Sequence, residues 1–359
     1  MRPISLEAKK MDFTDNPFQI LEAKLTDDRK RLTELADERN LEGDWPILGQ
    51  SLSILINPRK RLIAEIAWLP QSSIQNLDDL LKLAFIGPGK SPPPEKKILK
   101  LLEFNKLTPI AAANLIAAGL KRLKTSQSSL IHKWLIFLSN LFDKINPIET
   151  MDQINCDRKT AGFPLICDLA LVRDAILGRR TYFREIMRSA LDQLKPQVLV
   201  ETITLTVTAA TLLGRRACPP LIADLVNLYE VEAQEFLAIE DRNIDLTVTK
   251  LIYAIQNKSP EPILEDIIKQ LNSIIYNWNL ISKPIRICAN SQGIIHKNSQ
   301  KLSNKIQILV FDIIPDKIPK NLSKSIINAL KDSLADDKNL TKTILDNYTT
   351  FIRTKKTGS

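Results

Sequence analysis

Residues 57–70 read NPRKRLIAEIAWLP, and they give the clearest indication of how the N-terminal part of the chain folds. Asn57 can cap the free N–H groups at the start of a helix, and Pro58 is already shaped for the first helical position. An apolar run extends to Leu69, after which Pro70 makes further helix unfavourable. The stretch therefore predicts a helix over residues 59–69.

The same start signal occurs upstream, where Asn16 and Pro17 precede a short helix. Phe18 and Leu21 are three residues apart and share one face of that helix. A third helix is expected to begin near Trp45-Pro46 and to end before Asn57. The side chains that it should turn inward are Ile47, Leu48, Leu52 and Leu55.

Between these two lies a predicted helix over residues 27–39. Thr26 is a plausible N-cap, and the two acidic residues that follow it suit the positive end of the helix dipole. One side of this helix is densely charged. The other carries an apolar stripe of Leu32, Leu35 and Ala36.

The order of these four helices resembles a J-domain. Residues 17–21 match its aromatic-Leu first helix, and residues 57–61 are similar to the Asp-Pro-x-x-Arg that opens its last helix. Residues 61–70 look still more like a subset of bacterial J-like proteins associated with Hsp70-type chaperones. The family-signature residues are Asn16, Pro17, Phe18, Leu21, Asn57, Pro58, Leu62, Glu65, Trp68, Leu69 and Pro70.

The chain departs from the J-domain pattern between the second and third helices. A J-domain carries His-Pro-Asp there, whereas residues 39–44 read RNLEGD, and the only histidines are His132 and His296. The resemblance therefore does not imply stimulation of an Hsp70 ATPase by the usual route. It does imply a basic docking face, for which the candidate residues are Arg29, Lys30, Arg31, Arg59, Lys60 and Arg61.

The alternative for these basic residues is a solvated helix face. Its charges would then make only i,i+4 pairs, such as Arg31 with Asp27, each worth roughly 0.3–0.5 kcal/mol.

A Pro/Gly cluster divides the chain. Helical spacing resumes at Leu77 and stops at residues 86–95, IGPGKSPPPE, which are expected to form an exposed linker. The prolines that follow Lys90 and Ser91 exclude the helix that a phosphate-binding loop requires. We expect a J-like module over residues 12–76, a short helix and linker over 77–97, and a helical scaffold over 98–359.

The scaffold has helical spacing in segments separated mostly by prolines, including Pro284, and no fixed repeat. An all-α fold is predicted, with the J-like module followed by an irregular helical array or solenoid. Residues 154–158, 161–164, 229–234 and 277–285 look similar to the continuation of the same J-like proteins. The expected helices span 95–104, 108–123, 129–143, 165–178, 181–193, 197–213, 220–237, 243–256, 262–279, 301–314, 322–334 and 342–354.

Composition narrows the function classes. Only 10 glycines occur in 359 residues, which argues against glycine-rich nucleotide-binding folds. The four cysteines form no CxxC and are expected to be reduced, buried thiols in a cytoplasmic protein. No apolar run has the length of a membrane helix, and Glu232 and Glu235 lack the histidines of a metal helix. We expect no cofactor, no metal and no catalytic activity.

The net charge of +9 favours acidic partners. The leading hypothesis is a co-chaperone-like adaptor that binds an Hsp70-family partner, another protein, or both. The alternative is a basic helical scaffold that binds nucleic acid, which is less favoured because no nucleic-acid motif accompanies the charge. That alternative requires basic strings to converge, among them residues 121–124, 179–180, 214–216 and 353–356.

Overall fold

The computed structural model describes residues 11–40, 45–69, 107–121, 128–313, 319–335, 341–347 and 349. These residues form helices joined by turns and loops, and no β-strand occurs among them. The predicted all-α class is therefore confirmed. The predicted linker, residues 77–97, and signature residue Pro70 lie outside the described residues, as do residues 41–44 of the loop between the second and third helices.

The chain divides into two compact units. The first reaches Leu199 and also takes in Pro219–Leu221, and the second contains the remaining residues after Leu199. The predicted J-like module thus shares one compact unit with the first scaffold helices.

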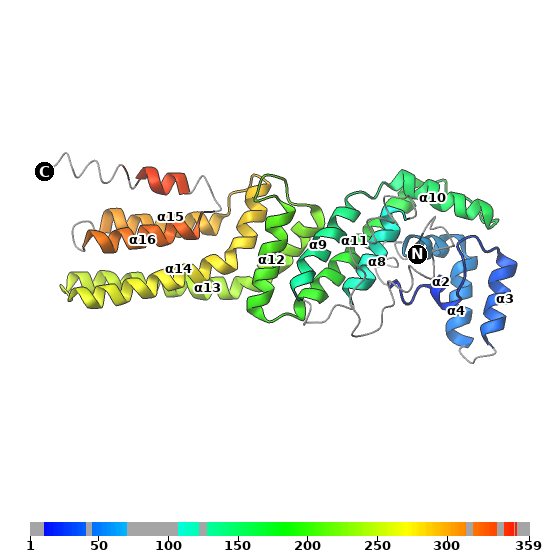
Figure 1. Ribbon diagram of the computed structural model, residues 1–359, viewed down its shortest axis with the longest axis horizontal. Helices are drawn as coiled ribbons and strands as arrows, with labels where there is room; N and C mark the ends of the chain where they lie inside the picture. Colours follow the sequence, from blue (N-terminus) through cyan, green and yellow to red (C-terminus); the bar gives the residue numbers. More distant parts are fainter. Residues whose placement is uncertain are drawn as a thin grey trace. The chain divides into compact units, whose positions relative to one another are not determined.

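The four predicted N-terminal helices are present as α2 (Pro17–Ile20), α3 (Arg29–Asn40), α4 (Trp45–Ile56) and α5 (Pro58–Ile66), shown in blue in Figure 1. Asn16 caps α2 and Asn57 caps α5, each with a proline at the first helical position, as predicted. The cap of α3 differs from the expectation. Asp28, and not Thr26, accepts a hydrogen bond from the backbone N–H of Arg31, at 2.8 Å.

These helices close on a shared core. Helix α4 contacts α2, α3 and α5, and the signature side chains Phe18, Leu21 and Leu62 are at most 1% exposed. The expected inward set of α4 is only partly right. Leu48 and Leu55 are buried and Leu52 is half-buried, but Ile47 is exposed because it lies one residue, about 100°, round the helix from Leu48.

The rest of the first unit consists of α8 (Pro109–Leu120), α9 (Ser128–Phe142), α10 (Pro147–Thr160) and α11 (Leu169–Asp192). Helix α11 contacts α5, α8, α9 and α10 and so links the N-terminal helices to the others (Figure 1). Helix α8 is buried from Ile110 to Leu120. Gly119 allows α9 to lie against it, since a Cβ there would come within 2.5 Å of the ring of Trp134.

Two sequence predictions in this region were wrong. Helix α10 was not expected, because its buried face includes Thr150, Asp157 and Arg158 and therefore shows no apolar stripe. The predicted break before Thr181 is absent. Helix α11 runs through Gly178, because burial of that segment outweighs the roughly 1 kcal/mol cost of an interior glycine.

Helix α12 (Pro196–Ala210) spans the boundary between the units, and the second unit continues with the 37-residue helix α13 (Pro220–Gln256). Helix α13 was predicted as two segments. It is joined to α14 by the Tyr229 hydroxyl, which donates to the carbonyl of Ile281 at 2.9 Å. The remaining elements are α14 (Glu261–Ser291), α15 (Lys297–Ile308), the π-helix η3 (Leu309–Ile313) and α16 (Lys320–Ser333).

Helix α14 continues past Asn279, where the prediction ended it, and contains Pro284 in its interior. A proline inside a helix removes one hydrogen bond and costs about 3 kcal/mol. Residues on both sides of it are buried, and Arg286 binds the carbonyl of Ser333 at 2.9 Å. Packing of this segment against α16 therefore keeps the helix continuous.

None of the described helices combines the length and the apolar character that a membrane crossing demands.

Candidate docking surface and its buried support

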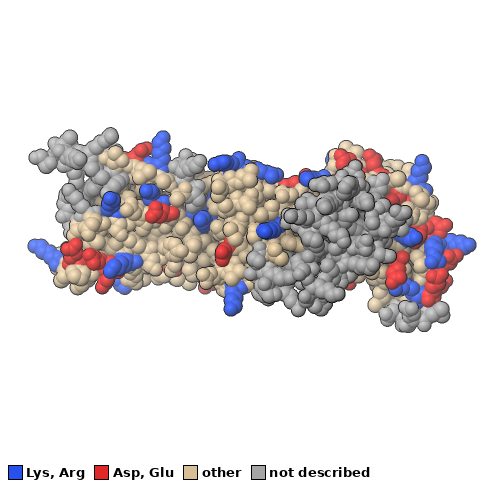
Figure 2. Space-filling view, in the orientation of Figure 1, with Lys and Arg blue, Asp and Glu red and all other residues tan. Residues whose placement is uncertain are grey.

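The charged face of α3 carries the first three candidate docking residues. Arg29, Lys30 and Arg31 are all exposed. Figure 2 shows acidic and basic side chains intermixed over this part of the molecule. The face is therefore not uniformly basic, and the three residues differ in how strongly their neighbours engage them.

Arg31 is the most engaged of the three. Its guanidinium binds Glu34 at 3.2 Å and Glu38 at 3.0 Å, not the predicted Asp27. Hydrogen bonds from Arg31 to Glu38 and then to Glu34 raise the pKa of Arg31 above its ordinary value. Much of its charge is thus neutralised within the helix, which makes it the weakest docking candidate on α3.

Lys30 and Arg29 keep more of their charge available to a partner than Arg31 does. The Lys30 side chain is 86% exposed and its ammonium lies 3.9 Å from Glu34, at the outer limit of an ion pair. The Arg29 guanidinium lies 5.5 Å from the ring centre of Phe163, which holds it at the side of α3 through a cation–π contact.

The second group of candidates, at the start of α5, is split by burial. Arg59 and Lys60 are exposed, and their backbone N–H groups donate to the Asn57 side chain, each at 3.1 Å. Arg61 is completely buried. It therefore cannot belong to a docking surface, and the prediction for Arg61 was wrong.

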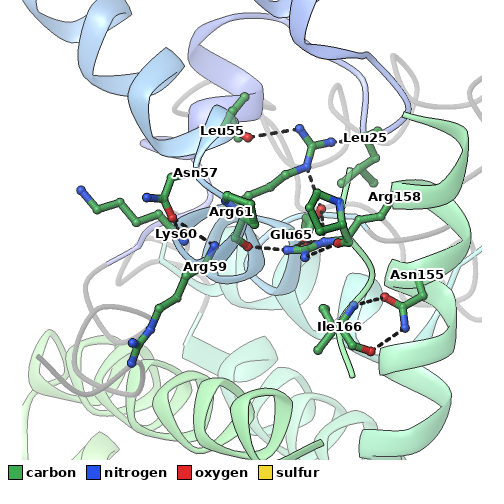
Figure 3. Close-up of polar contacts among 12 residues, drawn as sticks. Leu25, Leu55, Asn57, Arg59, Lys60, Arg61, Glu65, Asn155, Arg158 and Ile166 are labelled. Carbon is green, nitrogen blue, oxygen red and sulfur yellow. Dashed lines mark hydrogen bonds and ion pairs between the residues drawn. The ribbon is translucent and has the colours of Figure 1, made fainter. Parts of the chain in front are cut away.

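Arg61 belongs instead to a buried ion network centred on Glu65 (Figure 3). The Glu65 carboxylate is 0% exposed and accepts from Arg61 Nε at 2.8 Å and from Arg158 of α10 at 2.8 and 2.9 Å. Burial lowers the pKa of Arg61, and the charge of Glu65 opposes that effect. Glu65 is thus the shared anion of two buried guanidinium groups from different parts of the chain.

The remaining N–H groups of both arginines bind backbone carbonyls. Arg61 donates to Leu25 at 2.6 Å and to Leu55 at 3.4 Å. Arg158 donates to Pro58 at 2.7 Å and to Pro164 at 3.0 Å. A buried ion pair is tolerated when such extra hydrogen bonds replace the lost water. The network also ties the start of α5 to the loop after α10.

That loop brings an aromatic ring to the network. The centre of the Phe163 ring lies 3.9 Å from the guanidinium carbon of Arg61. The loop is held by Asn155, whose side chain exchanges two hydrogen bonds with the backbone of Ile166, at 2.7 and 3.0 Å (Figure 3). Phe163 therefore lies against Arg61 on one side and near Arg29 on another.

A second buried contact holds the C-terminal end of α5. The Asn114 side-chain amide of α8 donates to the carbonyls of Ile66 and Trp68, both at 2.8 Å. Its oxygen accepts from Arg179 of α11 at 2.7 Å. These bonds satisfy carbonyls that the end of a helix leaves without an intrahelical partner.

The segment before α2 completes this contact. Arg179 also donates to the carbonyl of Met11 at 2.6 Å, and the Tyr182 hydroxyl donates to Asp12 at 2.9 Å. Asp12 is bound by Lys121 as well. The neighbouring residue, Phe13, stacks on Trp68 with ring centres 4.5 Å apart. Signature residue Trp68 is thus enclosed by two parts of the first unit.

Sequence reasoning missed the residues that fix α5 from outside the module. Residues 154–158 and 161–164 stood out as similar to the same J-like proteins, yet nothing in them predicted that Arg158 and Phe163 would contact Arg61 and Glu65. Asn114 gave no signal, and Arg179 stood out only as part of a basic string, because a polar residue in a helical segment is usually exposed.

The basic strings of the nucleic-acid hypothesis do not all provide surface charge. Arg179 is completely buried, and Lys121 is engaged by Asp12. Arg215 and Arg216 are exposed. Residues 122–124 and 353–356 lie outside the described residues.

Comparisons with models of known protein families, with curated proteins and with solved structures found no match to this chain.

Proposed function

We propose that this protein is a non-catalytic, co-chaperone-like adaptor that docks an Hsp70-family chaperone through the exposed basic residues Arg29, Lys30, Arg59 and Lys60. In this proposal α3 and the start of α5 present the surface, and other helices bind a second protein. The proposal includes a location in the bacterial cytoplasm, which the resemblance to bacterial J-like proteins implies. The proposal includes binding without stimulation of the ATPase, because the His-Pro-Asp tripeptide is missing from residues 39–44.

The observation that carries the proposal is the arrangement of the four N-terminal helices. The signature side chains of α2 and α5 form the core, while α3 keeps its charged face exposed. Arg29 and Lys30 occupy the position at which the J-domain resemblance implies a basic docking face. Both remain exposed, although Arg61 does not.

The buried network suggests that a docked chaperone would be held in a fixed orientation. Helix α5 is tied to α8, α10 and α11 by charged and polar bonds as well as by apolar packing. A chaperone docked on α3 would therefore be held in a fixed orientation relative to the helices of the first unit. A J-domain on a flexible linker gives no such orientation.

Charge reversal on α3 tests the proposal. The immobilised full-length protein is titrated with a purified bacterial Hsp70 over a series of salt concentrations. The double variant Arg29→Glu with Lys30→Glu should bind at least roughly tenfold more weakly, because an attractive charge contact becomes repulsive. The wild-type affinity should fall as salt rises.

A matched control separates docking from net charge. Lys133→Glu with Lys159→Glu changes the charge by the same amount at exposed positions on α9 and α10. It should bind Hsp70 like the wild type. Equal loss of affinity in both double variants, or no binding by the wild type at low salt, would remove the docking surface from the proposal.

The same proteins test the alternative that the chain binds nucleic acid and not Hsp70. A labelled duplex should not be retarded by the wild type at moderate salt. Retardation that weakens steeply with salt, together with no affinity for Hsp70, would favour the basic scaffold instead.

A further inference from the structure

Two cysteines in the second unit lie beside each other at opposite ends of long helices. Cys218 stands two residues before α13, and Cys288 lies in the last turn of α14. The backbone N–H of Cys218 donates to the Ser291 hydroxyl at 3.1 Å, and that hydroxyl donates to the carbonyl of Cys288 at 2.7 Å. One serine therefore holds the two cysteine backbones together.

The two thiols also interact directly. A hydrogen bond from Cys218 lowers the pKa of Cys288 below its ordinary value, although burial and the nearby Glu230 act in the opposite direction. The same interaction, with burial, raises the pKa of Cys218. Of the two thiols, Cys288 is therefore the one that ionises more readily. The thiolate is the reactive form of cysteine.

Small molecules have a route to Cys288. The side chain is only 4% exposed, but it lines a cavity of about 400 Å³ between α13, the end of α14 and the start of α15. The polar part of the lining includes Glu230, His296 and Lys297. Cys218, at 7% exposed, is absent from that lining. An oxidant entering the cavity would therefore meet Cys288 first.

The other cysteines are in different surroundings. Cys156 and Cys167 are exposed in the first unit, which corrects the expectation that all four thiols would be buried. Exposure alone does not make a thiol reactive, since reactivity depends on ionisation as well.

We propose that Cys288 and Cys218 form a peroxide-oxidised dithiol site, independent of chaperone docking. The Cys288 thiolate attacks one oxygen of hydrogen peroxide, breaking the O–O bond and giving a sulfenic acid and hydroxide. The Cys218 sulfur then attacks the sulfenic sulfur, which forms the S–S bond and releases water as the Cys218 proton is taken up. Overall, two thiols and one peroxide give one disulfide and two waters.

The disulfide would join the segment before α13 to the last turn of α14. Reversal requires a thiol reductant, which attacks the disulfide through a mixed-disulfide intermediate.

Peptide mapping tests the assignment on the full-length protein. A background variant with Cys156→Ser and Cys167→Ser, both exposed, retains only the two buried thiols. It is treated with hydrogen peroxide, blocked with a maleimide and digested with trypsin. We expect the peptide of residues 217–242 linked to that of residues 287–297, lighter than the sum by two hydrogen atoms. Dithiothreitol should abolish the linked species.

Single replacements in the same background test the order of events. With Cys218→Ser, peroxide should leave Cys288 as a sulfenic acid that a dimedone probe traps in good yield. With Cys288→Ser, Cys218 should give at least roughly tenfold less adduct, because it does not line the cavity and burial still raises its pKa. Circular dichroism verifies that each variant remains folded.

Several results would overturn the proposal. They are the absence of the linked pair from folded, peroxide-treated protein, its appearance only after unfolding in urea, and equal trapping at Cys218 and Cys288.

Discussion

Two groups of arginine–glutamate pairs in the first unit have the same chemistry and very different surroundings. Glu65 binds Arg61 and Arg158 with all three side chains at most 3% exposed. Arg31 binds Glu34 and Glu38 on α3 with every partner at least 45% exposed. The distances are similar, between 2.8 and 3.2 Å. Burial, and not distance, therefore distinguishes a network that fixes the fold from one that remains on the surface.

Burial also separates neighbouring basic residues. Arg59, Lys60 and Arg61 are consecutive, yet only the first two are exposed. A charge in water is available to a partner, whereas a charge inside the protein must be satisfied by the protein itself. The stability lost on removing a carboxylate should therefore decrease with exposure, from Glu65 through Asp12 to Glu38.

The largest loss of stability is expected when Glu65 is replaced. The substitution Glu65→Gln keeps the shape of the side chain but leaves the buried guanidinium groups of Arg61 and Arg158 without an anion. The free energy of unfolding should fall by about 3–5 kcal/mol. Urea unfolding followed by tryptophan fluorescence, to which the buried Trp68 and Trp134 contribute, measures it. A loss no larger than that of an exposed carboxylate would show that burial is not the deciding factor.

An intermediate effect is expected at Asp12, whose partner Lys121 has a half-exposed side chain. Burial alone would raise the pKa of Asp12, but hydrogen bonds from Lys121 and Tyr182 outweigh it and hold the pKa below 3.8, its ordinary value. The folded state thus binds this proton less readily than the unfolded state. The stabilisation is complete above the ordinary pKa and is lost as the pH falls through the folded pKa.

The substitution Asp12→Asn tests this contribution. Its unfolding free energy, measured from about pH 7 down to pH 2, should fall less steeply at the acid end than that of the wild type. The other carboxylates contribute equally to both curves, so the difference between them reports Asp12. Parallel curves would mean that Asp12 contributes no more to stability than the exposed ion pairs of α3.

The smallest effect is expected on α3. The substitution Glu38→Gln removes one partner of Arg31 but leaves Glu34 and the surrounding water. Stability should change by less than about 0.5 kcal/mol, and the change should disappear at high salt. The same urea titration measures it. A loss of several kcal/mol would mean that α3 depends on its surface charges for folding.

Part of the fold could be predicted because its signals are local. Asn16-Pro17 and Asn57-Pro58 start helices through bonds made within three residues, so they act in the same way whatever surrounds them. The failures occurred where distant packing decides the outcome. Helix α10 has a partly polar buried face, and α14 continues through Pro284, because other helices cover those segments.

The candidate surface shows the same division. The exposure of Lys30 follows from the apolar stripe on the opposite side of α3, which the sequence displays directly. Arg29 lies three residues before Leu32 and seven before Ala36, so its exposure does not follow from that stripe. The burial of Arg61 does not follow from its own stretch, where it continues a run of basic residues. Its surroundings depend on Arg158 and Phe163, about a hundred positions away.

By itself the sequence determined that this protein is all-helical, where its N-terminal helices begin, and which side of α3 is charged. Only the tertiary structure decided which charges are buried, that α5 is enclosed by α8, α10 and α11, and that Cys218 meets Cys288. The physical reason is the distance along the chain over which each kind of interaction acts. Caps, turns and amphipathic stripes depend on neighbours within one or two helical turns, whereas desolvation and ion pairing depend on residues brought together from anywhere in the chain.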